Sequence, residues 1–474
     1  MQLEFLSILS SAELQQIEDA TEHILSKTGV KVLSARMRAL LKKKGVPVDE
    51  DQQIVRFPDR LLIEMIAEVP ESFEVFSREG EMCFELADGT PRVAAGHNAV
   101  FWVDSDRGET RPSTCADVEA FTRICEQLPN IDMIGIPVMP QDVPNSRASL
   151  LYALKAVIEN SRKPVFFSTD NAAVNNACID MLRGAFAGDL QSQPYGICQL
   201  SPTSPLYWEE GVTDAMIDAI DAGVPIAVLP EPNAGVSAPF TLAGLLTLNN
   251  IECLSGLAMI QLLSPGHPCL YANSWTTTDM RTGAALVGSI ETTILRVAGG
   301  QLAAYYSLPC HTTAPNSDNH AHDEQNAWEK TLSQFCAMAG GNDLIVNCGM
   351  FATGMTCSHE QLIMDEEITA LCRRLMRGFE VNRETVARGL IEQIGPQGGT
   401  YLTTDHTLEW LRSDEYHTPS VAVRGPYASW QAAGAPDSYT LARERARELM
   451  AIEPPPLARD RAAHLQRIIS DFNG

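Results

Sequence analysis

The residues best suited to chemistry are polar side chains that directly follow short apolar segments. The clearest example is Cys269–Ala272, after which the chain carries Asn273, Trp275 and Arg281. A buried strand that ends in a loop of hydrogen-bonding side chains is typical of one repeat of a (β/α) barrel at its active face. The sequence holds about eight such repeats. We therefore expect the site to lie where their polar ends converge.

The candidate site residues are polar side chains at strand ends and aromatic side chains near the same loops. They are Glu231, Asn273, Arg281, His311, Phe101, Trp102, Trp275 and Tyr305. Aromatic rings could form a cage that attracts a quaternary ammonium ion through cation–π interactions. Each ring could instead belong to the core or to a subunit contact. Glu231, which stands between two prolines, could instead cap neighbouring backbone.

Catalytic pairs and metal ligands are weakly indicated. The sequence has no G-x-S-x-G motif, and no lysine stands at a predicted strand end, so covalent mechanisms are disfavoured. His320 and His322 precede Asp323 in a segment that reads as a loop, and this spacing is unlike the i, i+4 pair of a helical metal site. We expect no bound metal. A zinc-dependent hydrolase or thiol methyltransferase that uses these histidines and a cysteine stays open as an alternative.

The remaining pattern organises these loops into an α/β fold. Eight apolar segments, each followed by a helical pattern, predict a closed (β/α)8 barrel. The expected strands are 92–95, 132–137, 164–168, 195–200, 225–229, 268–272, 302–307 and 343–346. An α+β appendage that ends in a hairpin (72–77 and 82–86) is expected over residues 1–91. The barrel is expected over 92–378 and a helical extension over 379–474.

Composition limits the partners and the compartment. The net charge of -25 argues against nucleic acid and anionic membrane surfaces, because both repel an acidic protein. No apolar run reaches the length of a membrane span, and the amino terminus has no basic region before its apolar residues. The twelve cysteines are scattered without CxxC spacing. These features predict a reducing, cytoplasmic location.

Four stretches resemble the trimethylamine methyltransferase superfamily. They are ETRPSTCADVEAFTRICEQLPNIDMIGIPVMPQDVP, KPVFFST, NAGVSAPFTLAGLLTLNNIECLSG and HEQLIMDEEI. The resemblance runs from about Gly29 to the last predicted helix. It implies a TIM barrel that moves a methyl group from an amine to the cobalt of a separate corrinoid protein. We also expect a homo-oligomer.

One departure from the family decides the expected substrate. The founding enzyme carries pyrrolysine after the seventh strand, whereas Thr312 to Asp323 holds only standard residues here. The chain is therefore similar to the non-pyrrolysine branch, which implies a small quaternary amine, glycine betaine first, and cob(I)alamin as methyl acceptor. Arg281 is the expected carboxylate partner, supported by His311 and Asn273, unless it pairs with Asp279. A non-catalytic betaine-binding protein is the other alternative.

Overall fold

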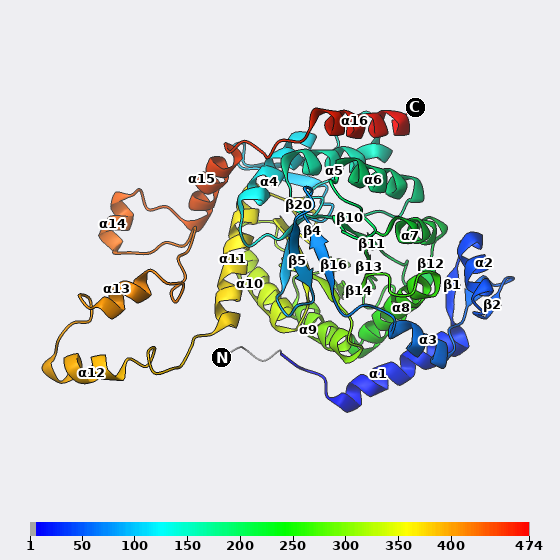
Figure 1. Cartoon of the computed structure of the whole chain (residues 1–474), viewed down its shortest axis with the longest axis horizontal. Coiled ribbons are helices and arrows are strands. Elements are labelled where there is room, and N and C mark those ends of the chain that lie inside the picture. Colours follow the sequence, from blue (N-terminus) through cyan, green and yellow to red (C-terminus); the bar gives the residue numbers. More distant parts are fainter. Residues whose placement is uncertain (1–5, 474) are drawn as a thin grey trace.

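Eight parallel strands close into a barrel, as the sequence predicts. The computed structural model describes residues 6–473, so the first five residues of the predicted appendage and amino terminus lie outside it. The order around the barrel is β10-β11-β13-β14-β17-β18-β6-β9, and β9 pairs back to β10 (Figure 1). The strands are β6 (Arg92–Ala95), β9 (Met133–Ile134), β10 (Val165–Ser168), β11 (Gly196–Leu200), β13 (Ile226–Val228), β14 (Cys269–Asn273), β17 (Cys310–Thr313) and β18 (Leu344–Cys348).

A helix follows each strand and covers the outside of the barrel (Figure 1). Local sequence sets where these helices begin. Thr114 and Asp117 form a reciprocal capping box at the first helix, and Ser358 accepts a hydrogen bond from the Gln361 backbone at the last. The helices are α4 (Cys115–Gln127), α5 (Ser149–Asn160), α6 (Ala172–Ala185), α7 (Glu210–Ala222), α8 (Leu242–Leu263), α9 (Ile290–Tyr305), α10 (Glu324–Ala339) and α11 (His359–Arg377).

The prediction of the seventh strand was wrong. Residues 302–307 form the last turn of α9 and the bend after it, and the strand is Cys310–Thr313. Gly299 and Gly300 lie inside α9, where each allows a close approach. A Cβ at Gly300 would stand 2.1 Å from the carbonyl oxygen of Gly340. α9 begins only at Ile290, because β15 (Thr277–Asp279) and β16 (Ala284–Leu286) form a hairpin first.

A second hairpin packs into one end of the barrel. β4 (Phe73–Phe76) and β5 (Met82–Leu86) pair antiparallel, as expected from their alternating apolar residues. Phe73, Val75, Phe84 and Leu86 form one apolar cluster with residues of the barrel interior, among them Phe166. The hairpin lies over the barrel centre in Figure 1. The hairpin closes the end of the barrel where the strands begin. The polar side chains lie at the opposite end, where the strands end.

The rest of the N-terminal part packs against the barrel wall. α1 (Ser11–His23) and α3 (Asp59–Ile66) lie on α8, and a π-helical turn, Ile24–Thr28, links α1 to a small sheet. That sheet joins β1 (Val30–Val32), β2 (Val48–Asp49) and β3 (Ile54–Val55) to β12 (Tyr207–Trp208), and α2 (Ala35–Lys43) follows β1. Because β12 comes from a barrel loop, the appendage and the barrel share hydrogen bonds. The proposed boundary at residue 91 remains a prediction.

Another small sheet lies beside the strand ends, and a series of helices completes the C-terminal part. The sheet contains β7 (Phe101–Asp104), β8 (Glu109–Pro112), β19 (Met350–Phe351) and β20 (Thr356–Cys357). After α11 come α12 (Arg388–Ile394), a 3-10 turn (Gly395–Gln397), α13 (Asp405–Leu411) and α14 (Tyr427–Ala432). α15 (Ser438–Met450) then packs on α11 and α4, and α16 (Arg459–Asn473) packs on α6 and α5. The boundary at residue 378 likewise remains a prediction.

α8 is the one helix within residues 6–473 that is long and apolar enough to cross a bilayer. Its 18-residue apolar window is 83% buried inside the protein, against the barrel and the N-terminal helices. Core packing therefore accounts for its composition. All twelve cysteines, which lie between residues 83 and 372, are free thiols.

Candidate active site

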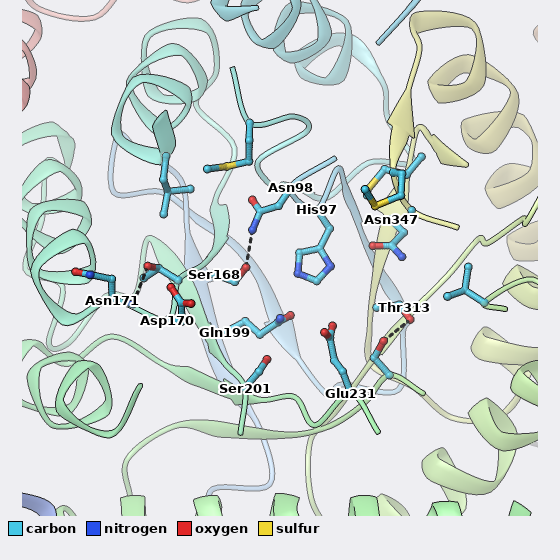
Figure 2. A pocket seen from close by; sticks show the side chains of 18 of the residues that line it. His97, Asn98, Ser168, Asp170, Asn171, Gln199, Ser201, Glu231, Thr313 and Asn347 are labelled. Atoms are coloured by element: carbon cyan, nitrogen blue, oxygen red, sulfur yellow. Dashed lines mark hydrogen bonds between the residues drawn. The ribbon is translucent and has the colours of Figure 1, made fainter. Parts of the chain in front are cut away.

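A cavity of about 1300 Å3 opens at the carboxyl ends of the barrel strands. Every one of the eight strands, or the loop directly after it, contributes to its wall, so the polar strand ends do converge. The lining side chains shown in Figure 2 are mostly polar. Strand ends contribute His97, Asn98, Met139, Ser168, Thr169, Asp170, Asn171, Gln199, Ser201, Glu231, Asn233, Ser274, Thr276, Thr313 and Asn347.

Hydrogen bonds between strand ends fix part of this wall. Asn98 Nδ2 donates to Ser168 Oγ at 2.7 Å, which joins the end of β6 to the end of β10, the strand beyond β9 (Figure 2). Ser274 Oγ and Thr313 Oγ1 lie 3.2 Å apart and join β14 to β17. Their polar atoms are thus preorganised, which favours binding of a small polar ligand without large rearrangement.

Acidic groups dominate the charge of the cavity. Glu231 follows β13 and Asp170 follows β10, and both side chains line the wall. The Glu231 side chain is reached by solvent inside the cavity but is enclosed by protein, and this burial raises the pKa of its carboxyl group. No salt bridge to either acid occurs among residues 6–473. A cationic ligand would therefore meet uncompensated negative charge.

Arg147 is the one lysine or arginine that lines the cavity within the described chain. It belongs to a 3-10 turn, Ser146–Ala148, between β9 and α5, and its side chain is exposed. β10 and β11 separate this loop from the β13 end that carries Glu231. Arg147 and Glu231 therefore lie at different parts of the cavity opening. Phe472 of α16 also lines it, and Asn145 Nδ2 donates to Asn473 Oδ1 at 2.9 Å.

Two histidines, the half-buried His97 and the fully buried His311, lie at the base of the site. The His97 ring packs edge-on against Phe166 with centroids 5.8 Å apart, and Phe166 in turn lies 5.1 Å from the ring of His311. Burial lowers the pKa of His97 to about 4 and that of His311 to about 3. Both imidazoles are therefore neutral near pH 7. They do not repel a cation.

The four predicted cage aromatics do not line the cavity. Trp275 is fully buried, while its neighbours Ser274 and Thr276 face the cavity, because side chains alternate along an extended segment. Trp102 packs on Phe121 and His359 in the outer sheet. Phe101 is exposed on the same sheet, and the Tyr305 hydroxyl donates to Glu18 Oε2 at 2.6 Å on α1. The structure therefore shows no aromatic cage built from these four rings.

Of the predicted polar site residues, Glu231 lines the cavity and three others do not. The Arg281 side chain is 90% exposed and pairs with Asp279 at 3.1 Å, the structural role weighed against carboxylate binding. Asn273 is buried at the end of β14, where its side chain accepts from Thr312 Oγ1 at 2.7 Å. His311 lies below the cavity, with Nδ1 3.2 Å from the carbonyl oxygen of Leu344.

Several cavity residues were missed in the sequence. Gln199 had a signal, because an amide inside the buried strand Gly196–Leu200 must find a polar neighbour. Arg147 and Asn233 lie in loops whose course the pattern of apolar residues does not define. No feature of the sequence points to Phe472, because it reaches the cavity only through the packing of α16 on the barrel.

The candidate metal residues are used in other contacts. His322 Nε2 lies 3.0 Å from Ser358 Oγ, and its ring packs against Phe351 and Tyr439. Burial lowers the pKa of His322 to about 4. His320 is exposed. In the part of the chain that the structure describes, no three His, Cys, Asp or Glu side chains are grouped closely enough to hold a metal ion.

Comparison with known proteins agrees with the geometry. Residues 1–471 match the trimethylamine methyltransferase (MTTB) family. The trimethylamine methyltransferase MttB of Desulfitobacterium hafniense is 29% identical over 469 residues, covering 98% of this chain and 94% of the relative. A glycine betaine methyltransferase of the same species is 26% identical, covering 98% and 96%. The crystal structure of the Methanosarcina barkeri monomethylamine methyltransferase shares the fold, with a TM-score of 0.50, 13% identity and 92% coverage of both chains. The chain belongs to the trimethylamine methyltransferase family.

Proposed function

We propose that this protein transfers a methyl group from a small quaternary amine, with glycine betaine first, to the cob(I)alamin of a separate corrinoid protein. The released product is the tertiary amine, dimethylglycine in the case of glycine betaine. Family membership supports the methyl transfer, and the relative named as a glycine betaine methyltransferase supports the substrate class. The observation that carries the proposal is the distribution of charge in the cavity. Uncompensated carboxylates and a lone arginine match a zwitterion.

The ammonium end is assigned to Glu231. The trimethylammonium group has no N–H to donate, so it is recognised by charge and shape rather than by hydrogen bonds. A carboxylate enclosed by protein attracts it more strongly than one in bulk water, because the local dielectric constant is lower. Asp170 adds to the same negative field from the neighbouring wall. We assign to these two acids the attraction of the ammonium group, which the sequence analysis had assigned to an aromatic cage.

The carboxylate end is assigned to Arg147 instead of Arg281. Arg281 points into solvent and already pairs with Asp279, whereas Arg147 lines the cavity. A guanidinium can hold a carboxylate with two parallel hydrogen bonds. Its long side chain can reach inward from the mouth. Choline, which has a hydroxyl in place of the carboxylate, gains nothing from this contact, so Arg147 favours betaines over choline.

The chemistry asks little acid–base work of the protein. The C–N bond breaks with its electron pair kept by nitrogen, and the methyl carbon forms a new bond with the electron pair of the reduced cobalt. The leaving amine is neutral, so no proton is needed at that step. The neutral His97 and His311 are compatible with this, and the chain's own residues act by binding, orientation and exclusion of water. A cavity of about 1300 Å3 leaves space for the acceptor group beside the small donor.

The direct test is an anaerobic assay with purified protein, glycine betaine and reduced cobalamin, free or bound to its carrier protein. Formation of dimethylglycine together with methylcobalamin supports the proposal. A tight betaine complex without any methyl transfer would support a binding protein instead. Stoichiometric zinc in the active protein, with activity lost to a chelator and restored by zinc, would support the zinc-dependent alternative. A cytoplasmic location, suggested by the twelve free thiols, is part of the same proposal.

A further inference from the structure

A segment between α11 and α15 projects away from the barrel (Figure 1). We name residues 379–437, which include α12, α13 and α14, the arm. None of the arm helices has a buried residue. The flanking α11 and α15, by contrast, bury residues against each other and against α4. The arm helices therefore have no core of their own, and Val421 is the one arm residue that is buried in the main hydrophobic core.

The arm exposes apolar side chains to an unusual degree. Within residues 6–473, 28 large apolar side chains are exposed, and ten of them lie between Val381 and Tyr427. Leu402 is 82% exposed, Leu411 is 74% exposed and Tyr416 is 79% exposed. An exposed concentration of apolar side chains on a soluble chain marks an interaction site. The arm thus presents a surface that another molecule covers.

The arm is held firmly at its root. Arg374 donates to the carbonyl oxygen of Glu415, and Arg377 pairs with Asp414. Further along, Glu367 accepts from the backbone and hydroxyl of Ser420 and lies 2.9 Å from His417. These contacts hold residues 414–420 of the arm against α11. The arm therefore extends from a fixed point of attachment on α11.

A second apolar surface lies next to the root. Trp328 and Leu332 are four residues apart on α10, and Leu371 and Leu375 are four residues apart on the adjacent α11. Residues at this spacing share one helix face, and all four are exposed. We name these four residues the stripe. Because α11 ends at Arg377, two residues after Leu375, the arm begins next to the stripe.

We propose that the arm packs on the stripe of a second copy of this chain, while the arm of that copy packs on the stripe of the first. A chain that carries both an arm and its target is self-complementary, as a two-fold dimer requires. A stable interface uses roughly 20–30 residues and about 800 Å2 on each side. The arm alone spans residues 379–437, so two reciprocal arms supply enough surface.

The position of the arm favours a second copy over the methyl-accepting protein. α11 follows β18 and runs back along the barrel, so its end at Arg377 lies at the barrel end remote from the cavity. The part of the arm that follows α13 is attached there, because Arg374 and Arg377 bind Glu415 and Asp414. A protein that delivers a methyl acceptor must engage the cavity mouth instead. The arm is also acidic, with eight Asp or Glu against four Arg, which disfavours nucleic acid.

The test uses light scattering after size-exclusion chromatography at micromolar concentration. We expect the wild type to be a dimer or a multiple of one. Leu402→Asp with Leu411→Asp in the arm, and Trp328→Asp with Leu375→Asp in the stripe, should each shift the protein to monomer. Ile63→Asp on α3, which is 57% exposed and outside both surfaces, is the matched control and should not. Circular dichroism and thermal unfolding confirm that each variant is folded.

Mixing the two monomeric double variants gives a sharper result. Each variant then retains the surface that the other lacks, so one arm–stripe contact can form. We expect the mixture to contain dimer that neither variant forms alone. A monomeric wild type, or arm variants that stay dimeric, would overturn the proposal. So would arm variants that stay oligomeric but lose productive contact with the corrinoid protein, because the arm would then bind that partner.

Discussion

Lys330 and Asp365 form a fully buried ion pair, with Nζ 2.7 Å from Oδ2. Lys330 Nζ also donates to the carbonyl oxygen of Pro315, and Asp365 Oδ2 accepts from the backbone N–H of Gly349 at 2.7 Å. Pro315 follows β17 and Gly349 follows β18. The pair therefore ties together the two strand ends that supply Thr313 and Asn347 to the cavity.

Removal of one partner should destabilise the fold. Asp365→Asn leaves the Lys330 ammonium buried without its counter-charge, and Lys330→Met leaves the Asp365 carboxylate in the same position. Loss of one partner of a buried ion pair typically costs about 3–5 kcal/mol. We expect the free energy of unfolding, measured by urea titration, to fall by that order in either single variant. The double variant Lys330→Met/Asp365→Leu should be less destabilised than the sum of the two single changes. Additive losses would show that the two residues act independently.

Glu231→Gln should weaken betaine binding. At an effective dielectric constant of about 20, two unit charges about 5 Å apart attract by roughly 3 kcal/mol. We therefore expect a loss of about ten- to hundredfold in affinity, measured by calorimetry, for betaine and choline alike. Asn98→Ala, a neutral change in the same cavity, is the control and should have a smaller effect on the binding of the cation. Equal losses in both variants would place the charge recognition elsewhere.

Betaine affinity should depend on pH through Glu231. Burial raises the pKa of this carboxyl group in the free protein, and a bound cation favours its charged form. Binding therefore releases a proton when the carboxyl is protonated, so affinity is full above the raised pKa and falls as pH drops through it. The window lies above the ordinary value of 4.5. Calorimetry in buffers of different ionisation enthalpy detects the released proton, and Glu231→Gln should abolish this dependence.

Arg147→Gln should discriminate between ligands. We expect betaine affinity to fall by about three- to tenfold, the effect of a charge-assisted hydrogen bond at a partly exposed site, and choline affinity to change little. Arg281→Gln is the matched control, because its side chain lies in solvent beside Asp279. It should leave both ligands unaffected. If Arg281→Gln weakens betaine and Arg147→Gln does not, the carboxylate assignment is reversed.

Trp275→Ala should act on stability and not on ligand contact. The ring is fully buried away from the cavity, and loss of a buried tryptophan typically costs about 3–5 kcal/mol of unfolding free energy. Betaine affinity of the folded variant should stay within about threefold of wild type, because Ser274 and Thr276 keep their places. A large loss of affinity with unchanged stability would mean that the indole contacts the ligand after all.

The barrel could be predicted because short apolar strands alternate with capped helices, and this local pattern needs no knowledge of tertiary contacts. Glu231, His97 and Asn347 could be placed at the site because they follow predicted strands. The aromatic cage could not be judged in this way. Whether Trp275 or Ser274 faces the cavity depends on the phase of an extended segment, which two neighbouring polar residues do not reveal. The seventh strand was misplaced for a related reason, since Gly300 ends a helix in isolation but allows close packing here.

The measurement that tests the account most directly follows the methyl group itself. Glycine betaine with deuterated N-methyl groups is incubated anaerobically with the protein and its reduced corrinoid partner. We predict equal amounts of dimethylglycine and of acceptor that carries one deuterated methyl group, with the yield greatly reduced in Glu231→Gln. Transfer from trimethylamine but from no quaternary amine, or no transfer from any of glycine betaine, proline betaine, carnitine and choline, would contradict it.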